Sequence, residues 1–255
     1  MSKVSYDFSG ERFVVTGASS GMGRAVASEL ASAGATVLVI ARRKEKLAEL
    51  EQEYPGHIVS GVLDVRDSDA LFDAISSFVA SYGKLSGAVH AAGIFSSTPL
   101  RAYDETEAKK IMDISFWAGI RLMQIVNKKK HSKDGCSSVL FSSVAATIGE
   151  KSNFAYSSAK IAMQAAVRAI AKEIYPRKNR INTISPGWVR TEMTRYEEEK
   201  SQVSGKFYDW HLLGIGEPED VSGMVLFLLS DRAHWITGTN VVVDGGYLLG
   251  GIIKV

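Results

Sequence analysis

The chain has 255 residues, of which 45% are hydrophobic and 23% charged, and its formal net charge at pH 7 is +2. Balanced charge and ordinary apolar content exclude intrinsic disorder, and the small net charge argues against nucleic acid as the main partner. The single cysteine, Cys136, can form neither an internal disulfide nor a zinc site by itself. The first residues lack the apolar core of a signal peptide, and no apolar run approaches the ~20 residues that span a bilayer. We therefore expect a cytoplasmic protein with no membrane partner.

Short β-rich apolar runs alternate with helical patterns along the whole chain. The predicted strands cover residues 12–16, 36–40, 58–63, 87–91, 138–142, 180–184 and 240–243. The helices predicted between them include 24–33, 71–82, 106–128, 157–175 and 218–229. This order predicts a parallel sheet with right-handed crossovers and helices on both faces. No repeat or linker divides the chain, so we expect one α/β domain over residues 1–255, with a doubly wound sheet of mainly seven strands.

A glycine-rich turn joins the first predicted strand to the first helix. It contains Gly17, Ser19, Ser20, Gly21, Met22 and Gly23. Glycine at three positions lets the backbone bend tightly and approach a ligand without Cβ clashes. The helix N-terminus then offers free N–H groups and a partial positive charge to a pyrophosphate. The turn and its setting predict dinucleotide binding, with an ordinary strand–helix corner as the alternative.

The end of the second strand indicates which dinucleotide fits. An acidic residue there binds the ribose 2′-hydroxyl of NAD, whereas an Arg binds the 2′-phosphate of NADP. The sequence reads Ala41-Arg42-Arg43-Lys44 and has no acid before Glu45. These cations are either a solvated first turn of the next helix or a site for an anion. Because the helix dipole disfavours cations at this end, we predict NADP(H) as the cofactor, bound by Arg42 and Arg43.

Tyr156 and Lys160 are four residues apart on a predicted helix, so they share one face of it. Tyr196 and Lys200 have the same spacing, but they lie in an acidic run that is typical of a solvated surface. Tyr156 follows Ser143 by thirteen residues, and Ser143 comes directly after a predicted strand. This context favours the first pair as a functional one, at the edge of the sheet where ligands bind.

The three residue types suit the reduction of a carbonyl group, which needs a proton donor for the developing alkoxide. Lowering the tyrosine pKa from about 10 by about three units takes roughly 4 kcal/mol. One ammonium about 4 Å away supplies about that much at an effective dielectric constant of 20. We therefore predict that Lys160, helped by the positive charge of an oxidised nicotinamide, lowers the pKa of Tyr156. We also predict that Tyr156 is the catalytic acid and that Ser143 orients the substrate oxygen.

With these motifs the sequence resembles the short-chain dehydrogenase/reductase family in its short form. The resemblance runs from residue 13 to residue 246 and adds Asp64-Val65, His90-Ala91-Ala92-Gly93, Pro186-Gly187 with Thr191, and Asp244-Gly245-Gly246. It implies a Rossmann fold, Tyr156 as acid and base, Ser143 as the orienting residue, and Lys160 as a further ligand of the nicotinamide ribose.

The resemblance also implies a set of cofactor contacts. Asp64 and Val65 would border the adenine. Three consecutive residues would line the middle of the cofactor: Ala91, Ala92 and Gly93. The carboxamide end would be bound by Val189, through its backbone, and by Thr191, with Pro186 and Gly187 beside them. Arg42 falls where NADP(H)-dependent members carry an Arg, and Ala41 falls where NAD-dependent members tend to carry Asp.

Two segments depart from the family pattern. His90-Ala91 replaces the usual Asn-Asn, and we interpret His90 as a strand-end residue satisfied by backbone rather than as an acid or base. Asp113-Ile114-Ser115 stands where the family commonly has Asp-Val-Asn, whose Asn helps hold a water that relays protons to the lysine. We assign Ser115 to this catalytic position, where its shorter side chain would hold the water differently, and we still expect an active enzyme.

Substrate identity is expected to depend on a lid around residues 188–211. Its aromatic residues are Trp188, Tyr196, Phe207, Tyr208 and Trp210. They form either an apolar wall for a greasy or ring-containing carbonyl compound, or a set of contacts with the protein body. The basic run 128–133 is predicted to be a solvated cap of the long middle helix; the alternative is docking of an acidic acyl carrier protein, as in the family's 3-oxoacyl reductases.

The apolar tail 247–255 is too short to span a membrane. In the family this end packs at a subunit contact, so we expect a homo-oligomer, either a tetramer or a dimer. The five histidines and the cysteine show no metal-binding spacing, so no metal is predicted.

These observations predict an NADPH-dependent reductase of a ketone or aldehyde, reversible as an alcohol dehydrogenase. A 3-oxoacyl thioester and a small-molecule carbonyl compound both remain open as substrates. One alternative is an NAD-dependent epimerase or dehydratase, which the short C-terminal region and Arg42-Arg43 disfavour. The other is a non-catalytic NADP-binding redox sensor, which would not need Ser143, Tyr156 and Lys160 together.

Overall fold

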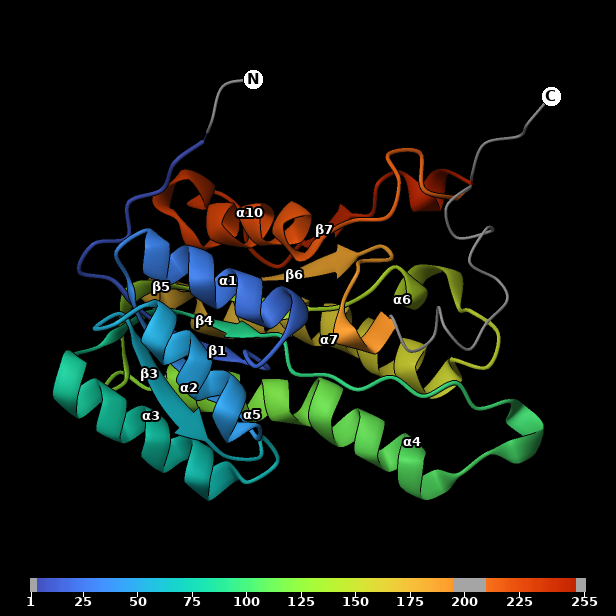
Figure 1. Cartoon of the computed structure of the whole chain (residues 1–255), viewed down its shortest axis with the longest axis horizontal. Helices are drawn as coiled ribbons and strands as arrows, with labels where there is room; N and C mark the ends of the chain where they lie inside the picture. The colour runs from blue at the N-terminus through green and yellow to red at the C-terminus, as the bar shows by residue number, and fades with distance from the viewer. Residues whose placement is uncertain (1–3, 195–209, 251–255) are drawn as a thin grey trace.

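The computed structural model describes residues 4–194 and 210–250 of the chain. Its strands pair in parallel and form one seven-stranded sheet in the order β3-β2-β1-β4-β5-β6-β7 (Figure 1). The strands are β1 (Arg12–Thr16), β2 (Thr36–Ala41), β3 (Ile58–Val62), β4 (Leu85–His90), β5 (Ser132–Phe141), β6 (Arg180–Pro186) and β7 (Asn240–Val243). The predicted doubly wound, parallel sheet is therefore confirmed.

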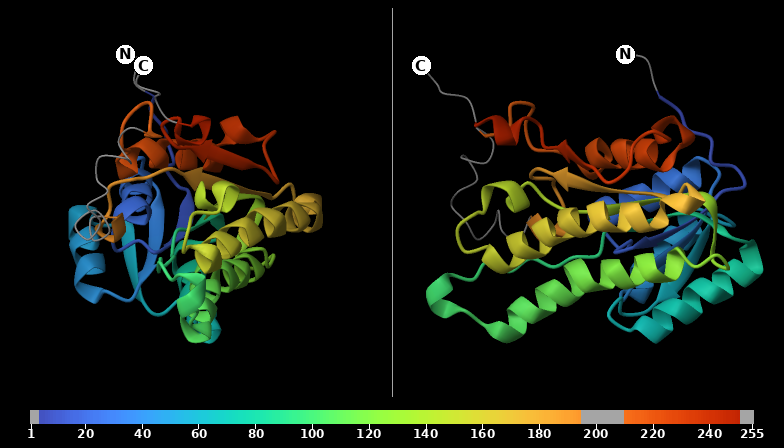
Figure 2. Two further views of the ribbon diagram at one scale, coloured as in Figure 1. Left: turned by 90° about the vertical axis from the view of Figure 1, so that its right-hand side faces the viewer. Right: turned by 180° about the vertical axis from the view of Figure 1, so that it is seen from behind.

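Helices cover both faces of this sheet (Figure 2). The face toward which Phe13 and Val15 point is covered by α1 (Gly21–Ser32), α2 (Lys44–Glu53) and α10 (Pro218–Leu229). The face of Val14 is covered by α3 (Ser68–Tyr82), α5 (Ala118–Val126) and α7 (Phe154–Ile174). Successive side chains of a strand point to opposite faces, so β1 is apolar at consecutive positions. Within residues 4–194 and 210–250, no helix is both long and apolar enough to cross a bilayer.

The predicted helix 106–128 is interrupted in its middle. It consists of a helix, a five-residue π-helical turn and a second helix: α4 (Glu105–Met112), Asp113–Trp117 and α5. The Ala118 N–H donates to the carbonyl of Asp113, whereas an α-helix would pair it with Ile114. The carbonyl of Ile114 instead accepts a hydrogen bond from His90 Nε2 on β4, at 3.1 Å. A partner on a distant strand holds this turn, so the local sequence pattern did not predict it.

The basic run 128–133 directly follows the end of that helix, as predicted, and its lysines 128–130 are exposed, but the run is solvated only in part. α5 ends at Val126, and β5 begins at Ser132, six residues before its predicted start. His131, in the middle of the run, is buried and contacts the carbonyl of Ile125 at 2.8 Å and the hydroxyl of Ser76 at 3.1 Å. These contacts attach the run to the core, so it forms the turn that leads from α5 into β5.

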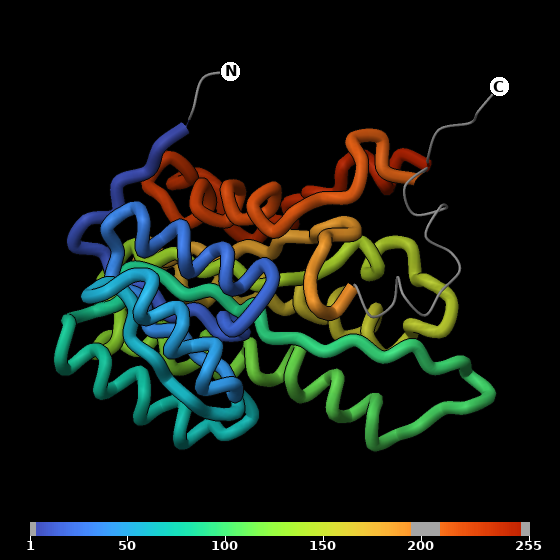
Figure 3. Tube along the Cα trace, in the orientation of Figure 1, coloured from blue at the N-terminus to red at the C-terminus, as the bar shows by residue number. Residues whose placement is uncertain are grey.

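The carboxyl ends of the central strands lie together at one edge of the sheet. Thr16 at the end of β1 stands opposite Ile40 of β2 and His90 of β4. The strand order reverses between β1 and β4, which is where ligands of doubly wound sheets bind. After β4 the chain runs away from the sheet through residues 91–104 before α4 returns toward it (Figure 3).

Candidate active site

The glycine-rich turn after β1 packs directly against the end of β4. Gly17 has a φ of +73°, and a Cβ at this position would lie 2.5 Å from the backbone nitrogen of Ala92. A Cβ on Gly23 would lie 2.4 Å from the carbonyl oxygen of Gly17. Both contacts are too short for any side chain, so only glycine fits either position. The turn therefore brings the start of α1 against the edge of the sheet.

The start of α1 faces a cleft of about 400 Å³. Ser20 is the N-cap in an extended conformation, no side chain caps the first turn, and that turn contains no acidic residue. The cleft is lined by the predicted residues of the glycine turn (17 and 19–23), by 42–43, 64–65 and 91–93, and by Thr191. A helix N-terminus with uncapped N–H groups in a glycine cradle suits the pyrophosphate of a dinucleotide. The residues present therefore fit the predicted cofactor.

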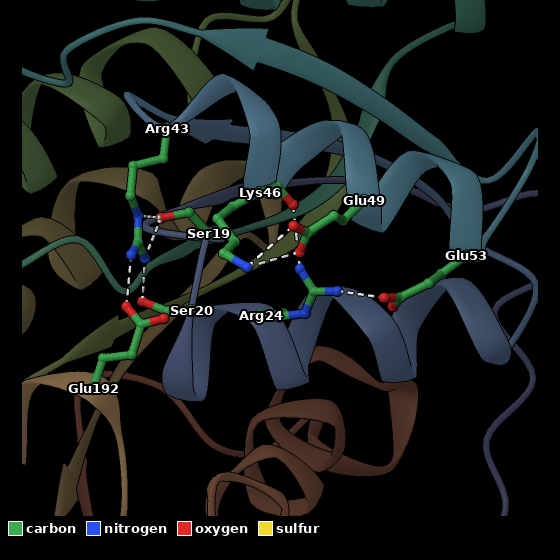
Figure 4. Close-up of polar contacts among 8 residues, drawn as sticks. All are labelled: Ser19, Ser20, Arg24, Arg43, Lys46, Glu49, Glu53 and Glu192. Carbon is green, nitrogen blue, oxygen red and sulfur yellow. Dashed lines mark hydrogen bonds and ion pairs between the residues drawn. The ribbon is translucent and has the colours of Figure 1, made fainter. Parts of the chain in front are cut away.

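The two arginines after β2 have different surroundings. Arg43 Nη2 donates to Ser19 Oγ at 3.0 Å and to Ser20 Oγ at 2.6 Å, and its Nη1 pairs with Glu192 Oε2 at 2.5 Å (Figure 4). Arg43 thus joins the glycine turn to the segment that follows β6. Arg42 also lines the cleft and is exposed, and its charge helps to lower the pKa of Asp64.

Asp64 follows β3 and lines the same cleft. Hydrogen bonds from Arg66, at 2.7 to 3.2 Å, lower the pKa of the Asp64 carboxyl to about 2, with a smaller contribution from the charge of Arg42. The carboxylate is therefore ionised at neutral pH and already paired with Arg66. Arg43, which follows β2 and bonds Ser19 and Ser20 of the glycine turn, is the guanidinium placed among hydroxyl groups that suit an anion.

A second, smaller cavity of about 110 Å³, the reactant pocket, adjoins this cleft. The two share three lining residues: Met22, Thr191 and Met193. The predicted residues Ser143 and Tyr156 line the reactant pocket. So do Pro186, Gly187 and Val189, which the resemblance assigned to the carboxamide end of the cofactor. The geometry therefore places Tyr156, the predicted proton donor, beside the residues that would bind the carboxamide end of the cofactor.

Tyr156 and Lys160 lie one turn apart on α7, and Ser143 lies just after β5. The Tyr156 ring is partly exposed to the pocket and packs edge-on against Phe95, with 5.4 Å between ring centroids. Lys160 is 3% exposed. Its Nζ donates to the carbonyl of Phe141 at 2.8 Å and lies 5.5 Å from the centroid of the Tyr156 ring. The three predicted catalytic residues therefore meet, as the sequence context indicated.

Lys160 by itself does not produce the predicted acidification of Tyr156. Burial raises the pKa of Tyr156 to about 12, the hydroxyl of Ser143 opposes this shift, and the negative charge of Glu150 adds to it. Burial also lowers the pKa of Lys160 to about 8. The ammonium lies over the face of the phenol ring and is bonded to a backbone carbonyl, so desolvation outweighs attraction between the two groups.

The two departures from the family pattern, His90 and Ser115, lie next to each other. His90 is buried, its Nδ1 lies 2.9 Å from Thr16 Oγ1, and its Nε2 bonds the carbonyl of Ile114 in the π-helical turn. A carbonyl only accepts, so Nε2 carries the proton and Nδ1 accepts from Thr16. Burial lowers the pKa of His90 to about 3, with the charge of Lys160 as a smaller cause. This agrees with a structural role, although one partner is a side chain rather than backbone.

Ser115 is the residue after Ile114 and is completely buried. Its hydroxyl oxygen has no hydrogen-bond partner among the described residues. A Cβ placed on Gly93 would lie 3.5 Å from Ser115 Oγ and 3.4 Å from Lys160 Nζ. The π-helical turn thus directs the Ser115 hydroxyl to the same place as the lysine ammonium, where an Asn stands in the family pattern.

Several residues at these cavities were not predicted from the sequence. Glu150 and Tyr247 line the reactant pocket, and Glu192 lines the cleft. Glu150 lies in a loop, Tyr247 in a short 3-10 helix, and Glu192 in the helical residues 192–194. No periodicity marks these short segments. Of the predicted lid, Trp188 lines the reactant pocket and Trp210 lies 5.8 Å from Tyr247 by ring centroids. The other lid aromatics and the Tyr196–Lys200 pair lie outside the described residues.

The strand order, the glycine cradle and the Ser–Tyr–Lys group together define a dinucleotide-binding oxidoreductase. Residues 17–248 match a family model described as enoyl-(acyl carrier protein) reductase. D-erythrulose reductase of Gallus gallus is 33% identical over 244 residues, which cover 95% of this chain and 97% of that protein. The 3-oxoacyl-[acyl-carrier-protein] reductase of Thermotoga maritima is 30% identical, over 94% of this chain and 98% of that protein.

Solved structures give the same result. A short-chain dehydrogenase/reductase from Brucella melitensis superimposes with a TM-score of 0.90 at 26% identity, over 96% of this chain and 99% of that one. A short-chain type dehydrogenase/reductase from Mycobacterium ulcerans gives 0.88 at 30% identity, over 97% and 92%. The chain belongs to the short-chain dehydrogenase/reductase family, whose members are oxidoreductases that use a nicotinamide cofactor.

Proposed function

We propose that the protein is an NADP(H)-dependent reductase of a ketone or aldehyde, and in reverse a dehydrogenase of the corresponding alcohol. The observation that carries the proposal is the Tyr156 side chain. It is partly exposed in a small pocket that adjoins the dinucleotide cleft, with Ser143 on the same pocket and Lys160 behind its ring. A proton donor is thus held beside the cavity where a carbonyl compound would meet the cofactor.

In this mechanism, reduced nicotinamide supplies a hydride to the carbonyl carbon when it is bound. Tyr156 donates its phenolic proton to the carbonyl oxygen, and its pKa of about 12 keeps that proton in place at neutral pH. Ser143 donates a hydrogen bond to the same oxygen and orients it. Lys160 stabilises the phenolate that remains, and Ser115 borders the route by which a proton returns to the lysine.

The preference for NADP(H) over NAD(H) is supported by the surroundings of Arg43. Its guanidinium lies between Ser19, Ser20 and Glu192, at the cleft. Hydroxyl groups and a guanidinium together suit a phosphate. Ala41 ends β2 where an acid would bind the free ribose hydroxyl of NAD. We infer that Arg43, more than Arg42, binds the 2′-phosphate.

A panel of ketones and aldehydes, assayed with NADPH and with NADH, tests the proposal. The expected result is oxidation of NADPH with at least one class of carbonyl compound, at a kcat/KM well above that with NADH. A wide preference for NADH would contradict the cofactor assignment. Tight NADPH binding without turnover of any carbonyl compound would contradict the enzymatic role and support a redox sensor.

We further propose that the protein is a homo-oligomer that associates near its C-terminal end. Several apolar side chains there are exposed: Trp210, Leu212, Leu213 and Leu249. They belong to one region, because the Leu213 N–H bonds the carbonyl of Gly245 and Trp210 lies against Tyr247. A shared exposed apolar surface is typical of a subunit contact. Light scattering of the purified protein is expected to give a dimer or tetramer, and a monomer would contradict this.

A further inference from the structure

Glu150 is the only charged side chain among the described residues that line the reactant pocket. The other lining groups are apolar side chains, hydroxyl groups and backbone. The residue lies in the loop between α6 (Ala145–Ile148) and α7, six positions before Tyr156. It is partly exposed, and none of the ion pairs between described residues involves it. The pocket therefore contains a carboxylate without a counter-charge from the described chain.

Neutral partners hold this carboxylate in place. The Tyr247 hydroxyl donates to Glu150 Oε1 at 3.0 Å, and Asn153 Nδ2 donates to Glu150 Oε2 at 3.0 Å. A carboxylate has about four acceptor sites, so each oxygen can still accept a hydrogen bond from a bound molecule. Because both oxygens are held, a ligand donor would meet an acceptor that is already oriented.

Tyr247 is itself fixed by the C-terminal turn. Its ring stacks on His211, with 4.6 Å between centroids, and is 8% exposed. The Asp244 carboxylate accepts from the N–H groups of Gly246 and Leu248, each at 2.9 Å, and so closes the turn on both sides of Tyr247. This explains the Asp244-Gly245-Gly246 motif as a support for the pocket wall.

The charge of Glu150 also acts on the phenol that donates the proton. It contributes to the raised pKa of Tyr156 and, after burial, to that of Tyr247. Coulomb attraction and repulsion act over several ångströms in a partly buried site. A reactant in the same pocket therefore experiences the same negative field.

We infer that Glu150 determines the substrate class: a carbonyl compound that carries a hydroxyl or amino hydrogen-bond donor near the reacting carbon, and no carboxylate or phosphate there. This inference rests on the proposed reductase function. A donor group completes the free acceptor sites of Glu150, whereas an anionic group would be repelled and would leave those sites unpaired. A hydroxyl group and an amino group can both donate a hydrogen bond to the Glu150 carboxylate, and a charged amino group is also attracted by its negative charge.

The test compares Glu150→Gln with Glu173→Gln. Both remove one negative charge, but Glu173 is exposed at the far end of α7. Dihydroxyacetone and acetoacetate serve as matched small ketones, with NADPH and NADH in parallel. The wild-type protein and Glu173→Gln are expected to prefer dihydroxyacetone by about tenfold or more in kcat/KM, and Glu150→Gln to reduce that ratio by about tenfold. The reduction is expected to come mainly from faster turnover of acetoacetate.

The pH dependence of kcat supplies a second readout. Removing the Glu150 charge is expected to move the apparent pKa assigned to Tyr156 downward, whereas Glu173→Gln leaves it unchanged. An equal loss on both ketones with an unchanged pH profile would mean that Glu150 only supports the loop, and would overturn the inference. Wild-type turnover of acetoacetate at the rate of dihydroxyacetone would overturn it as well, while the reductase function would stand. If no carbonyl compound is turned over with either cofactor, the proposed function itself fails.

Discussion

The dinucleotide cleft and the reactant pocket adjoin each other, but they differ in how far their charged side chains are exposed to water. In the cleft, Arg43 and Glu192 are exposed, with 44% and 55% of their side chains accessible, and they are paired with each other. Behind the reactant pocket, Lys160 is 3% exposed and its pKa is lowered by burial. Exposed ion pairs are screened by water and salt and contribute about 0–1 kcal/mol. A ligand can therefore exchange such pairs at small cost, whereas desolvation shifts the pKa values of the buried groups by one to several units.

This difference in exposure matches the different tasks proposed for the two cavities, cofactor binding in the cleft and proton transfer in the reactant pocket. A cofactor that enters and leaves needs partners that are released easily, and Arg43 has such partners in Ser19, Ser20 and Glu192. The proposed proton donor must keep its proton beside the reactant pocket, and burial raises the pKa of Tyr156 further above neutral pH. We therefore expect substitutions behind the reactant pocket to have large effects and substitutions in the cleft to have small ones.

The largest effect is expected for Tyr156→Phe. The phenylalanine ring keeps the contact with Phe95 but has no proton to donate. Turnover is expected to fall by about 10³-fold, within the range that general acid catalysis contributes, with little change in cofactor affinity. Steady-state kinetics with NADPH measures this loss. Tyr175→Phe, at an exposed site beyond the end of α7, is the control; a full rate in Tyr156→Phe would disprove the assignment.

The next largest effect is expected on the free energy of unfolding at acidic pH, which depends on the protonation of His90. In the unfolded chain the imidazole takes up a proton as the pH falls through about 6.5, whereas in the folded protein its pKa is about 3. Between these values the unfolded state binds more protons, so stability falls by about 1.4 kcal/mol for each pH unit. The contribution is fully present above pH ~6.5 and is lost on acidification.

His90→Asn is expected to remove this acid sensitivity. An Asn amide can still donate to the carbonyl of Ile114 but does not titrate. Between pH 7 and pH 4.5, wild type is expected to lose about 3 kcal/mol more stability than the variant, as measured by urea unfolding at both pH values. His234→Asn, at an exposed residue, is the control. Parallel losses in wild type and His90→Asn would show that His90 is not the group responsible.

A smaller effect is expected for Arg43→Gln in the cleft. Losing a charge-assisted contact to a phosphate is expected to raise the Kd for NADPH about tenfold and to leave the Kd for NADH nearly unchanged. Arg66→Gln removes the same charge at a guanidinium paired with Asp64 and serves as the control. Equal weakening of both cofactors would mean that Arg43 does not distinguish them.

The smallest effect is expected for Glu192→Gln. Glu192 pairs with Arg43 and so competes with any phosphate for it (Figure 4). Removing its charge is expected to tighten NADPH binding by a few-fold, about the contribution of one exposed ion pair. Glu53→Gln, whose partner is Arg24, is the matched control. Weaker NADPH binding in Glu192→Gln would show that the carboxylate supports the site rather than competing for it.

Much of this arrangement was predictable because it depends on local chemistry. A turn that needs glycine at Gly17 and Gly23 is visible in the sequence, and parallel strands place their carboxyl ends at one edge. Ser143, Tyr156 and Lys160 could be placed together because a strand end and a helical spacing each fix a direction.

The π-helical turn and the site residues in loops were not predictable in this way. The turn between α4 and α5 depends on His90, which is contributed by another strand. Glu150 was missed because it lies in a loop and because one of its two partners, Tyr247, comes almost one hundred residues further along the chain. Neither contact has a signature in periodicity or spacing.

By itself, the sequence determined the sheet, the glycine cradle and the family, and it named the candidate catalytic side chains. These follow from backbone geometry and residue chemistry, which act over a few neighbouring positions. Only the tertiary structure decided the protonation of Tyr156, Lys160 and His90, because the pKa of a group depends on how much water the whole fold removes from it. It also decided which arginine joins the glycine turn and which carboxylate lines the reactant pocket, since both depend on contacts between distant segments.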